Sequence, residues 1–312
     1  MSVVESVLAE EAFRRVSFPF EHGAMAGIAF GDASRPPDIV FLHGTGFNAR
    51  TYRRMLAPLG ERYHVLALDL RGHGLTTLPP KTWGYNSWHR HRDDVITVLD
   101  KHLGAPVTLA GHSMGATTAL LIAGKRPDLV RALAMTDPVF FSESAYRMME
   151  FPFLNDWIVK AGPIPHGVAR RRAHFASREE AVASLTGRGI FKTFPADVLA
   201  DYVADGMLDD PHGGVRLACA PAFESQTYKA QRHDPWRALA MYEGPIVLLR
   251  GEIGSTCAPS ITRRIKERHP GIRLATVEGS THALPMERPD RVRAAIEAAA
   301  LMSPGGRFRD LI

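Results

Sequence analysis

Short apolar runs alternate with helical stretches along this chain, and that alternation restricts its fold more than any other feature. Apolar runs typical of strands covered on both faces occupy residues 38–42, 64–70, 107–110, 131–135, 245–250 and 272–277. Helical spacing follows at residues 52–59, 88–103, 114–125, 260–268 and 288–302. Two alternating runs, 14–20 and 25–30, predict an opening β-hairpin. This order predicts an α/β fold, with a mostly parallel central sheet and helices on both faces.

The alternation stops between residues 139 and 236. This segment carries no clean buried strand; instead it has helical stretches at 178–185 and 196–204, aromatic clusters and several proline breaks. The chain has 312 residues, 45% of them apolar, which is enough to bury a sizeable core. We therefore predict one α/β core formed by residues 1–138 and 237–312, with residues 139–236 inserted as a helical segment.

The charge pattern argues against a nucleic-acid partner. Lys and Arg number 38 and Asp and Glu 33, a net charge of +5 that is spread along the chain. The densest basic run is Arg-Arg-Arg at 170–172, which we interpret as a solvated helix face. Nucleic-acid-binding proteins concentrate their basic residues on one face, so the excess positive charge is assigned to solubility.

Other features indicate a cytoplasmic protein without cofactors. Cys219 and Cys257 are too few for a disulfide framework and are not spaced as a zinc or redox pair. Residues 1–15 contain three glutamates and lack the apolar stretch of a signal peptide. No apolar run approaches the roughly 20 residues of a membrane-spanning helix. No ligand cluster or phosphate-binding loop appears, so neither a metal nor an organic cofactor is expected; the oligomeric state is not predicted.

The motif that carries chemistry is Gly-His-Ser-Met-Gly at residues 111–115, between the strand at 107–110 and the helix at 114–125. A serine on a sharp strand-to-helix turn projects its hydroxyl above the sheet edge, where a base can reach it. Gly111 and Gly115 suit this turn because a side chain at either position would clash with the neighbouring strand or helix. The pattern predicts Ser113 as a nucleophile.

Three motifs follow predicted strands in order: Phe-Leu-His-Gly at 41–44, Asp-Leu-Arg-Gly-His-Gly at 69–74, and Gly-His-Ser-Met-Gly at 111–115. Together with the late strands and His282, they resemble the α/β-hydrolase superfamily over about residues 14–302, apart from the insertion. The resemblance implies an α/β-hydrolase fold and makes residues 139–236 a helical cap over the active site. It is strong for the superfamily and identifies no single enzyme.

The resemblance also implies the oxyanion hole and the base. One backbone N–H of the hole comes from Met114, the residue after the nucleophile, and the other from Thr45 in the loop after the strand at 38–42. Among 14 histidines, His282 is the one that lies after the last predicted strand and before the last helix. The family places its general base there, and a histidine can take the serine proton and return it to the leaving group.

The acid departs from the common pattern. The loop after the strand at 245–250 holds no aspartate; Ser255 stands about where the family's Asp often falls, and Glu252 is the nearby carboxylate. A second acid position is known in this superfamily after the preceding strand, where this chain has Asp137, 24 residues beyond Ser113. We favour Asp137 as the acid, with Glu252 as the alternative and a site without a strong acid as a third reading.

The expected activity is hydrolysis of small to medium, fairly apolar carboxylic esters through an acyl-enzyme. Thioesterase, lactonase, carbon–carbon hydrolase and cofactor-free perhydrolase activities remain open, as does a small-molecule receptor or catalytically dead interaction module. Large apolar residues in or after the insertion are candidates for lining the pocket, and each is equally suited to a core position: Phe140, Phe141, Phe151, Trp157 and Leu284.

Overall fold

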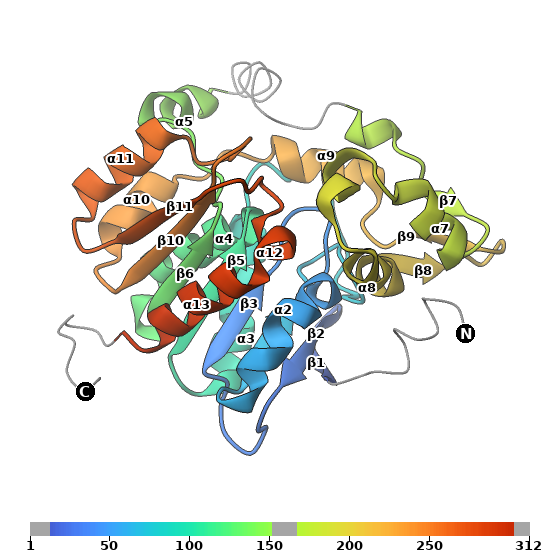
Figure 1. The fold of residues 1–312 in the computed structure, drawn as a ribbon, viewed down its shortest axis with the longest axis horizontal. Helices are drawn as coiled ribbons and strands as arrows, with labels where there is room; N and C mark the ends of the chain where they lie inside the picture. Colours follow the sequence, from blue (N-terminus) through green and yellow to red (C-terminus); the bar gives the residue numbers. More distant parts are fainter. Residues whose placement is uncertain (1–12, 152–166, 303–312) are drawn as a thin grey trace.

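The structure, a computed structural model, describes residues 13–151 and 167–302. Within them, an eight-stranded sheet has the order β1-β2-β4-β3-β5-β6-β10-β11 (Figure 1). β2 runs antiparallel to its neighbours β1 and β4, and the pairs from β4 to β11 are parallel. The strands are β1 (Arg14–Phe20), β2 (Gly23–Phe30), β3 (Ile39–Leu42), β4 (Val65–Leu68), β5 (Val107–His112), β6 (Val130–Thr136), β10 (Ile246–Gly251) and β11 (Arg273–Val277). The predicted hairpin and mostly parallel sheet are confirmed.

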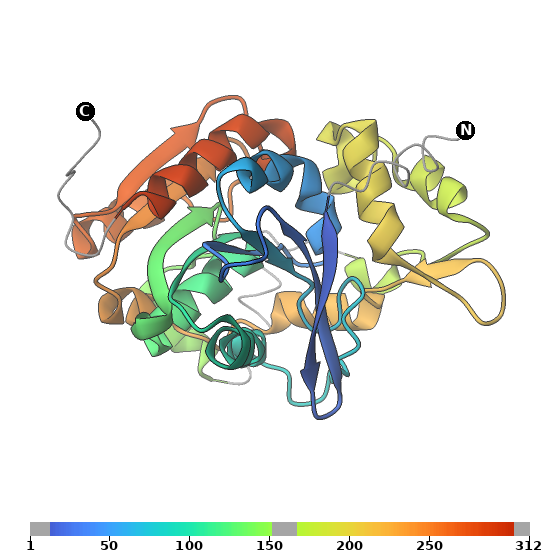
Figure 2. The ribbon, with the colours of Figure 1, turned by 90° about the horizontal axis from the view of Figure 1, so that it is seen from below.

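Helices cover both faces of this sheet, as Figure 2 shows from below. β6 illustrates why: Leu133 and Met135 point into an apolar cluster with α3, α4 and α10, whereas Ala132 and Ala134 point into a second cluster with α2 and α13. Alternate residues of a strand face opposite sides, so each strand contributes to both clusters. The core helices are α2 (Arg53–Leu56), α3 (His89–Val98), α4 (Met114–Lys125), α10 (Pro235–Met241), α11 (Pro259–Arg268), α12 (Leu284–Glu287) and α13 (Pro289–Ala300).

Two predicted helices are less regular than their apolar spacing suggested. Residues 52–59 form no single helix: α2 lies between two 3₁₀ turns, η1 (Ala49–Tyr52) and η2 (Ala57–Glu61), because Pro58 lacks the N–H that would continue the α-helical ladder. The helix predicted at 88–103 is α-helical only to Val98 and ends in the π-type turn η3 (Leu99–Leu103) before Gly104. A further 3₁₀ turn, η4 (Pro127–Leu129), precedes β6.

The segment between β6 and α10 is only partly helical. The segment was expected to be helical without a clean buried strand, but it also holds three strands of two or three residues, too short to show an alternating pattern, in an antiparallel sheet ordered β7-β9-β8. In Figure 1 this sheet lies with α7 and α8 beside the hairpin end of the core. The described elements are α5 (Glu143–Met149), η5 (Val168–Arg170), β7 (His174–Phe175), α7 (Arg178–Leu185), η6 (Gly189–Thr193), α8 (Ala196–Gly206), β8 (Met207–Asp209), β9 (Val215–Leu217) and α9 (Pro221–Lys229).

Buried ion pairs attach α8 to the core. Asp201 is fully buried and accepts from Arg53 Nε at 2.5 Å and from Arg54 Nε at 3.0 Å. Asp205, one turn further along α8, pairs with Arg15 at 2.9 Å. Breaking the Arg53–Asp201 pair, which is buried on both sides, would leave an uncompensated charge at a cost of about 3–5 kcal/mol, so this pair holds α8 against the core. Arg15 is 42% exposed, and its pair with Asp205 contributes less. At the other end of the insertion, α10 spans the predicted boundary after Trp236 and packs on α4.

The parallel strands all end at one edge of the sheet, and the segments that follow them gather there. These segments carry the residues singled out from the sequence: Gly44–Gly46 after β3, Ser113 after β5, Asp137 after β6, Glu252 and Ser255 after β10, and His282 after β11. Ligands of open α/β sheets bind outside the carboxyl ends of the strands. In the part of the chain that the structure describes, no helix has the length and apolar character needed to cross a membrane.

Candidate active site

Ser113 occupies a strained turn between β5 and α4. Its φ of 55° and ψ of −120° lie in a region that L-residues rarely adopt, at a cost of about 1–3 kcal/mol. Its backbone N–H donates to the Thr136 carbonyl at 2.9 Å, which ties the turn to β6. A Cβ on Gly111 would lie 2.5 Å from the Gly115 carbonyl carbon, and one on Gly115 would clash with the Leu42 carbonyl. The predicted strand–turn–helix and its need for both glycines are confirmed.

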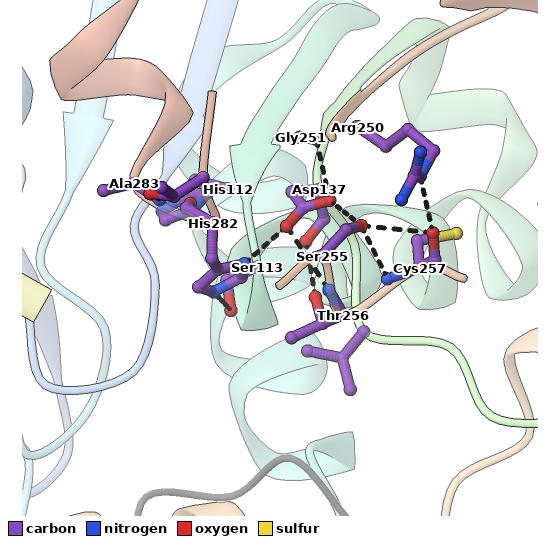
Figure 3. Close-up of polar contacts among 12 residues, drawn as sticks. His112, Ser113, Asp137, Arg250, Gly251, Ser255, Thr256, Cys257, His282 and Ala283 are labelled. Atoms are coloured by element: carbon purple, nitrogen blue, oxygen red, sulfur yellow. Dashed lines mark hydrogen bonds and ion pairs between the residues drawn. The ribbon is translucent and has the colours of Figure 1, made fainter. Parts of the chain in front are cut away.

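Ser113, His282 and Asp137 form one hydrogen-bonded chain (Figure 3). Ser113 Oγ lies 3.0 Å from His282 Nε2, and His282 Nδ1 lies 2.6 Å from Asp137 Oδ2. A carboxylate can only accept, so Nδ1 carries the ring proton and the Nε2 lone pair faces the serine hydroxyl. In this arrangement His282 accepts the hydrogen bond from Ser113, the geometry that a general base requires.

Asp137 is buried and held from several sides. Oδ1 accepts from the Gly251 N–H at 3.2 Å and from the Ser255 hydroxyl, and Oδ2 accepts from the Thr256 N–H at 3.4 Å (Figure 3). Burial by itself raises the pKa of Asp137, but the hydrogen bond and charge of His282 and the bond from Ser255 outweigh it, so the pKa is lowered. The carboxylate is therefore ionised at neutral pH.

The alternative acid lies elsewhere. Glu252 is exposed, and its Oε2 accepts from the backbone N–H of Gly279 at 2.8 Å. Asp137, not Glu252, is the carboxylate hydrogen-bonded to His282 Nδ1. Ser255 donates to Asp137, so this loop after β10 supplies a hydrogen-bond donor to the carboxylate that follows β6.

The loop after β3 leaves one N–H available at the site. The Gly44 N–H donates to the Tyr52 hydroxyl at 3.1 Å, and the Gly46 N–H donates to His73 Nε2 at 3.0 Å. Gly46 has a φ of 79°, which glycine adopts without strain. Among the described residues, the N–H of Thr45, between the two glycines, has no acceptor. Tyr52 and His73 thus fix the loop through its flanking N–H groups. Neither residue was predicted from the sequence for this role.

Thr45 and Met114 lie side by side. The Thr45 hydroxyl lies 3.4 Å from the Met114 sulfur, and a Cβ on Gly44 would lie 3.3 Å from the Ser113 Cβ. Met114 is the first residue of α4, and the first N–H groups of a helix have no intrahelical acceptor. The structure therefore brings both residues predicted to supply backbone donors next to the serine turn.

The predicted pocket residues occupy different environments. Phe140 and Leu284 are buried in the two core clusters, and Phe141 is half-buried against the first of them. Phe151 is 63% exposed, and Trp157 lies outside the described residues. The full burial of Phe140 and Leu284 matches the alternative reading as core residues, and a role of any of the five in substrate binding stays a prediction.

A charge pair between the half-buried Arg171 and the buried Glu224 packs on Gly46 in the loop after β3. Arg171 Nη1 donates to Glu224 Oε2 at 2.9 Å and Nη2 donates to the Tyr202 hydroxyl at 3.0 Å. The Glu224 carboxylate lies against Gly46, since a Cβ there would clash with its Oε1. The interpretation of 170–172 as a solvated face was wrong for Arg171, because its partner lies 53 residues away on α9 and no local pattern marks the pair.

The described residues include no group of three or more His, Cys, Asp or Glu side chains arranged to hold a metal ion. Several histidines are instead buried as neutral rings. Burial lowers the pKa of His73 to about 4 and that of His112 and His233 to about 3. His233 lies outside the serine chain and stacks on Trp88 with ring centroids 4.4 Å apart.

We expect His233 to make the protein less stable in acid. Its folded-state pKa lies below the value of about 6.5 in the unfolded chain, so unfolding takes up a proton between these values and stability falls as the pH falls. From pH 6 to pH 5 the loss attributable to His233 is about 1 kcal/mol. Urea unfolding of wild type and His233→Gln at both pH values measures it: the wild type should lose about 1 kcal/mol more than the variant. Equal losses would contradict the prediction.

The sheet order and the serine turn at its carboxyl edge define an α/β protein of the hydrolase class. Residues 39–295 match the profile of the Alpha/beta hydrolase family, and the chain belongs to that family. Its expected fold is thereby confirmed.

Several known proteins are similar over most of their length. The chain is 26% identical over 261 residues to 2-(acetamidomethylene)succinate hydrolase of Mesorhizobium japonicum (83% of this chain, 86% of the relative). It is 27% identical over 274 residues to mouse sn-1-specific diacylglycerol lipase ABHD11 (83% and 79%). Among solved structures, E-2-(acetamidomethylene)succinate hydrolase superposes with a TM-score of 0.73 at 23% identity (92% and 98%), and the thioesterase domain from the curacin biosynthetic pathway with 0.73 at 19% (92% and 100%).

Proposed function

We propose that this protein is a serine hydrolase that cleaves uncharged carboxylic esters of small to medium size through an acyl-enzyme intermediate. The observation that carries the proposal is the hydrogen-bonded chain from Ser113 through His282 to Asp137 at the carboxyl edge of the sheet. A serine hydroxyl that donates to a histidine, itself oriented by a buried carboxylate, is the arrangement that activates an alcohol as a nucleophile.

In the proposed reaction, Ser113 Oγ attacks the ester carbonyl while His282 Nε2 takes the hydroxyl proton. The negative charge that develops on the carbonyl oxygen accepts hydrogen bonds from the N–H groups of Thr45 and Met114, each worth about 3 kcal/mol in such sites. Collapse breaks the ester bond, and His282 gives its proton to the departing alcohol. Water, deprotonated by His282, then attacks the acyl-enzyme, and the acid leaves with Ser113 restored.

The charges near the loop after β3 support an uncharged substrate. Arg171 is paired with Glu224 through Nη1 and hydrogen-bonded to Tyr202 through Nη2, so its charge is neutralised where the pair packs against Gly46. Within the described residues, a substrate carboxylate brought there would lose its hydration beside an arginine already paired with Glu224, which is unfavourable. We take residues 139–236 as the cap and its apolar residues as candidates for contact with the acyl or alcohol group.

The test compares p-nitrophenyl esters of increasing acyl length with one charged ester of matched size, mono-p-nitrophenyl succinate against p-nitrophenyl pentanoate. The neutral ester should be hydrolysed at least about 10-fold faster in kcat/KM, because the charged acyl group pays for its desolvation. Faster hydrolysis of the succinate would overturn the uncharged-substrate proposal. It would instead favour a substrate of the kind named for the Mesorhizobium relative.

The same experiment also tests whether Ser113 cleaves a bond other than a carboxylic ester. A fluorophosphonate probe labels an activated serine whatever bond it cleaves. Labelling without ester hydrolysis would move the assignment to thioesters, lactones, carbon–carbon bonds or perhydrolysis. Absence of both would favour a small-molecule receptor or an interaction module on the same fold.

A further inference from the structure

A second hydrogen-bonded chain runs behind the nucleophile, through two residues that the proposed reaction does not use. The Gly44 N–H donates to the Tyr52 hydroxyl at 3.1 Å, and this hydroxyl lies 2.8 Å from His112 Nδ1. His112 Nε2 lies 2.8 Å from the backbone carbonyl oxygen of His282. The chain therefore connects the loop that carries Thr45 with the backbone of the proposed base.

Its two ends fix the direction of every hydrogen bond. The His282 carbonyl can only accept, so His112 Nε2 carries the proton, and Nδ1 of the neutral ring accepts. The Gly44 N–H can only donate, which leaves the Tyr52 hydroxyl proton to bond with His112. Each proton points from Gly44 toward His282. A chain in which all donors point one way is strengthened by mutual polarisation.

Both side chains are buried and keep the protonation states that the chain requires. Tyr52 is 1% exposed, and His112 is fully buried. Burial raises the pKa of Tyr52, so its hydroxyl keeps its proton, and burial lowers the pKa of His112 to about 3, so its ring is neutral at neutral pH. Tyr52 packs on Phe41 with ring centroids 4.7 Å apart, which fixes the position of the hydroxyl.

We propose that Tyr52 and His112 are positioning residues that keep His282 and the oxyanion loop at a fixed separation around Ser113. This inference rests on the proposed function of that site. His282 lies between β11 and α12, and the preceding Thr281 N–H donates to Glu287 at 2.6 Å. His112 holds the loop from the side of the nucleophile, while Glu287 holds it from α12.

Loss of this link should slow catalysis, because displacement of a reacting group by about 1 Å costs roughly 100-fold in rate. Loss of the Tyr52 hydroxyl leaves the Gly44 N–H and His112 Nδ1 without partners and removes the link between the two loops. Neither residue touches the substrate in the proposed reaction. The effect should therefore appear in kcat and leave KM nearly unchanged.

The first arm of the test is Tyr52→Phe, measured with a p-nitrophenyl ester and by the rate of fluorophosphonate labelling. We expect kcat and the labelling rate to fall about 10-fold, with KM within about twofold of wild type. The matched control is Tyr242→Phe: Tyr242 is also buried, and its hydroxyl donates to the Val130 carbonyl at 3.5 Å, at the end of β6 opposite the site. The control should keep the wild-type kcat.

The second arm separates linkage from packing. His112→Gln keeps a donor close to the position of Nε2, whereas His112→Leu removes both hydrogen bonds. Because Gln offers Tyr52 no acceptor at the place of Nδ1, kcat of His112→Gln should fall about as far as that of Tyr52→Phe, and kcat of His112→Leu should fall further. In a double-mutant cycle, Tyr52→Phe added to His112→Leu should cost little more, since both act on one chain. Thermal melting of each variant identifies any that fails to fold, and Tyr52→Phe then decides the question by itself.

The outcomes are distinct. An unchanged kcat in folded Tyr52→Phe, or full additivity of the two changes, overturns the linkage. A wild-type protein that neither hydrolyses esters nor reacts with the fluorophosphonate overturns the proposed function, and this inference with it. If the wild-type protein is labelled but hydrolyses no ester, the linkage is tested by comparing the labelling rates of wild type and Tyr52→Phe.

Discussion

Replacing Ser113 with alanine is expected to reduce ester hydrolysis about 10⁴- to 10⁶-fold and to abolish fluorophosphonate labelling. The variant removes the atom that forms the acyl-enzyme in the proposed reaction, and among the described residues no other hydroxyl is hydrogen-bonded to His282 Nε2. The substrate KM should stay close to that of wild type, since a methyl group replaces a side chain that is mostly buried. Steady-state kinetics with p-nitrophenyl butyrate measures both quantities.

A matched serine provides the control. Ser142 caps α5 through a hydrogen bond from the Ala145 N–H at 3.2 Å, and its removal should cost about 1 kcal/mol of stability with no change in kcat. Retention of hydrolysis in Ser113→Ala above about 1% of wild type would show that another group, or a contaminating enzyme, cleaves the ester. Purification of the variant on the same column and labelling of the preparation distinguish these two cases.

Much of the fold was predictable because its signals are local. Buried parallel strands read as continuous apolar runs, and the turn at Ser113 needs glycines at fixed offsets, so both features appear within a few residues. His282 could be selected among 14 histidines because the order of strands and helices places it at the correct sheet edge. These inferences rest on local patterns, on the chain order and, for His282, on the resemblance to the α/β-hydrolase superfamily, and they need no knowledge of tertiary contacts.

The remaining features depend on contacts between distant residues. The Glu224–Arg171 pair spans 53 positions and the bond from His112 to His282 spans 170, so no sequence window contains both partners. The same limit left Asp137 and Glu252 unresolved: both follow a parallel strand. Only the positions of their side chains in space distinguish the one that reaches His282 from the one that reaches Gly279. The strands of the small sheet were missed for a different reason. Two or three residues are too few to show the alternation of apolar and polar residues that marks a strand.

The acid itself gives the second large prediction. Asp137→Asn is expected to lower kcat about 10⁴-fold with little change in fold. The asparagine amide would present an N–H₂ group to His282 Nδ1, so that Nδ1 becomes an acceptor and the proton moves to Nε2, where it blocks acceptance from Ser113. The lost negative charge also leaves the imidazolium of the transition state uncompensated. The measurement is kcat over a range of pH, beside an unfolding curve.

Glu252→Gln is the matched control, because it makes the same chemical change at an exposed carboxylate whose Oε2 accepts from the Gly279 N–H. Its effect on stability should stay within about 0.5 kcal/mol, and its kcat should remain near that of wild type. The opposite ranking, with Glu252→Gln inactive and Asp137→Asn active, would assign the acid to the loop after β10. Equal small losses would mean that His282 acts without a strong acid. A loss confined to Asp137→Asn would instead tie the rate to the carboxylate that Gly251, Ser255 and Thr256 hold in place by hydrogen bonds.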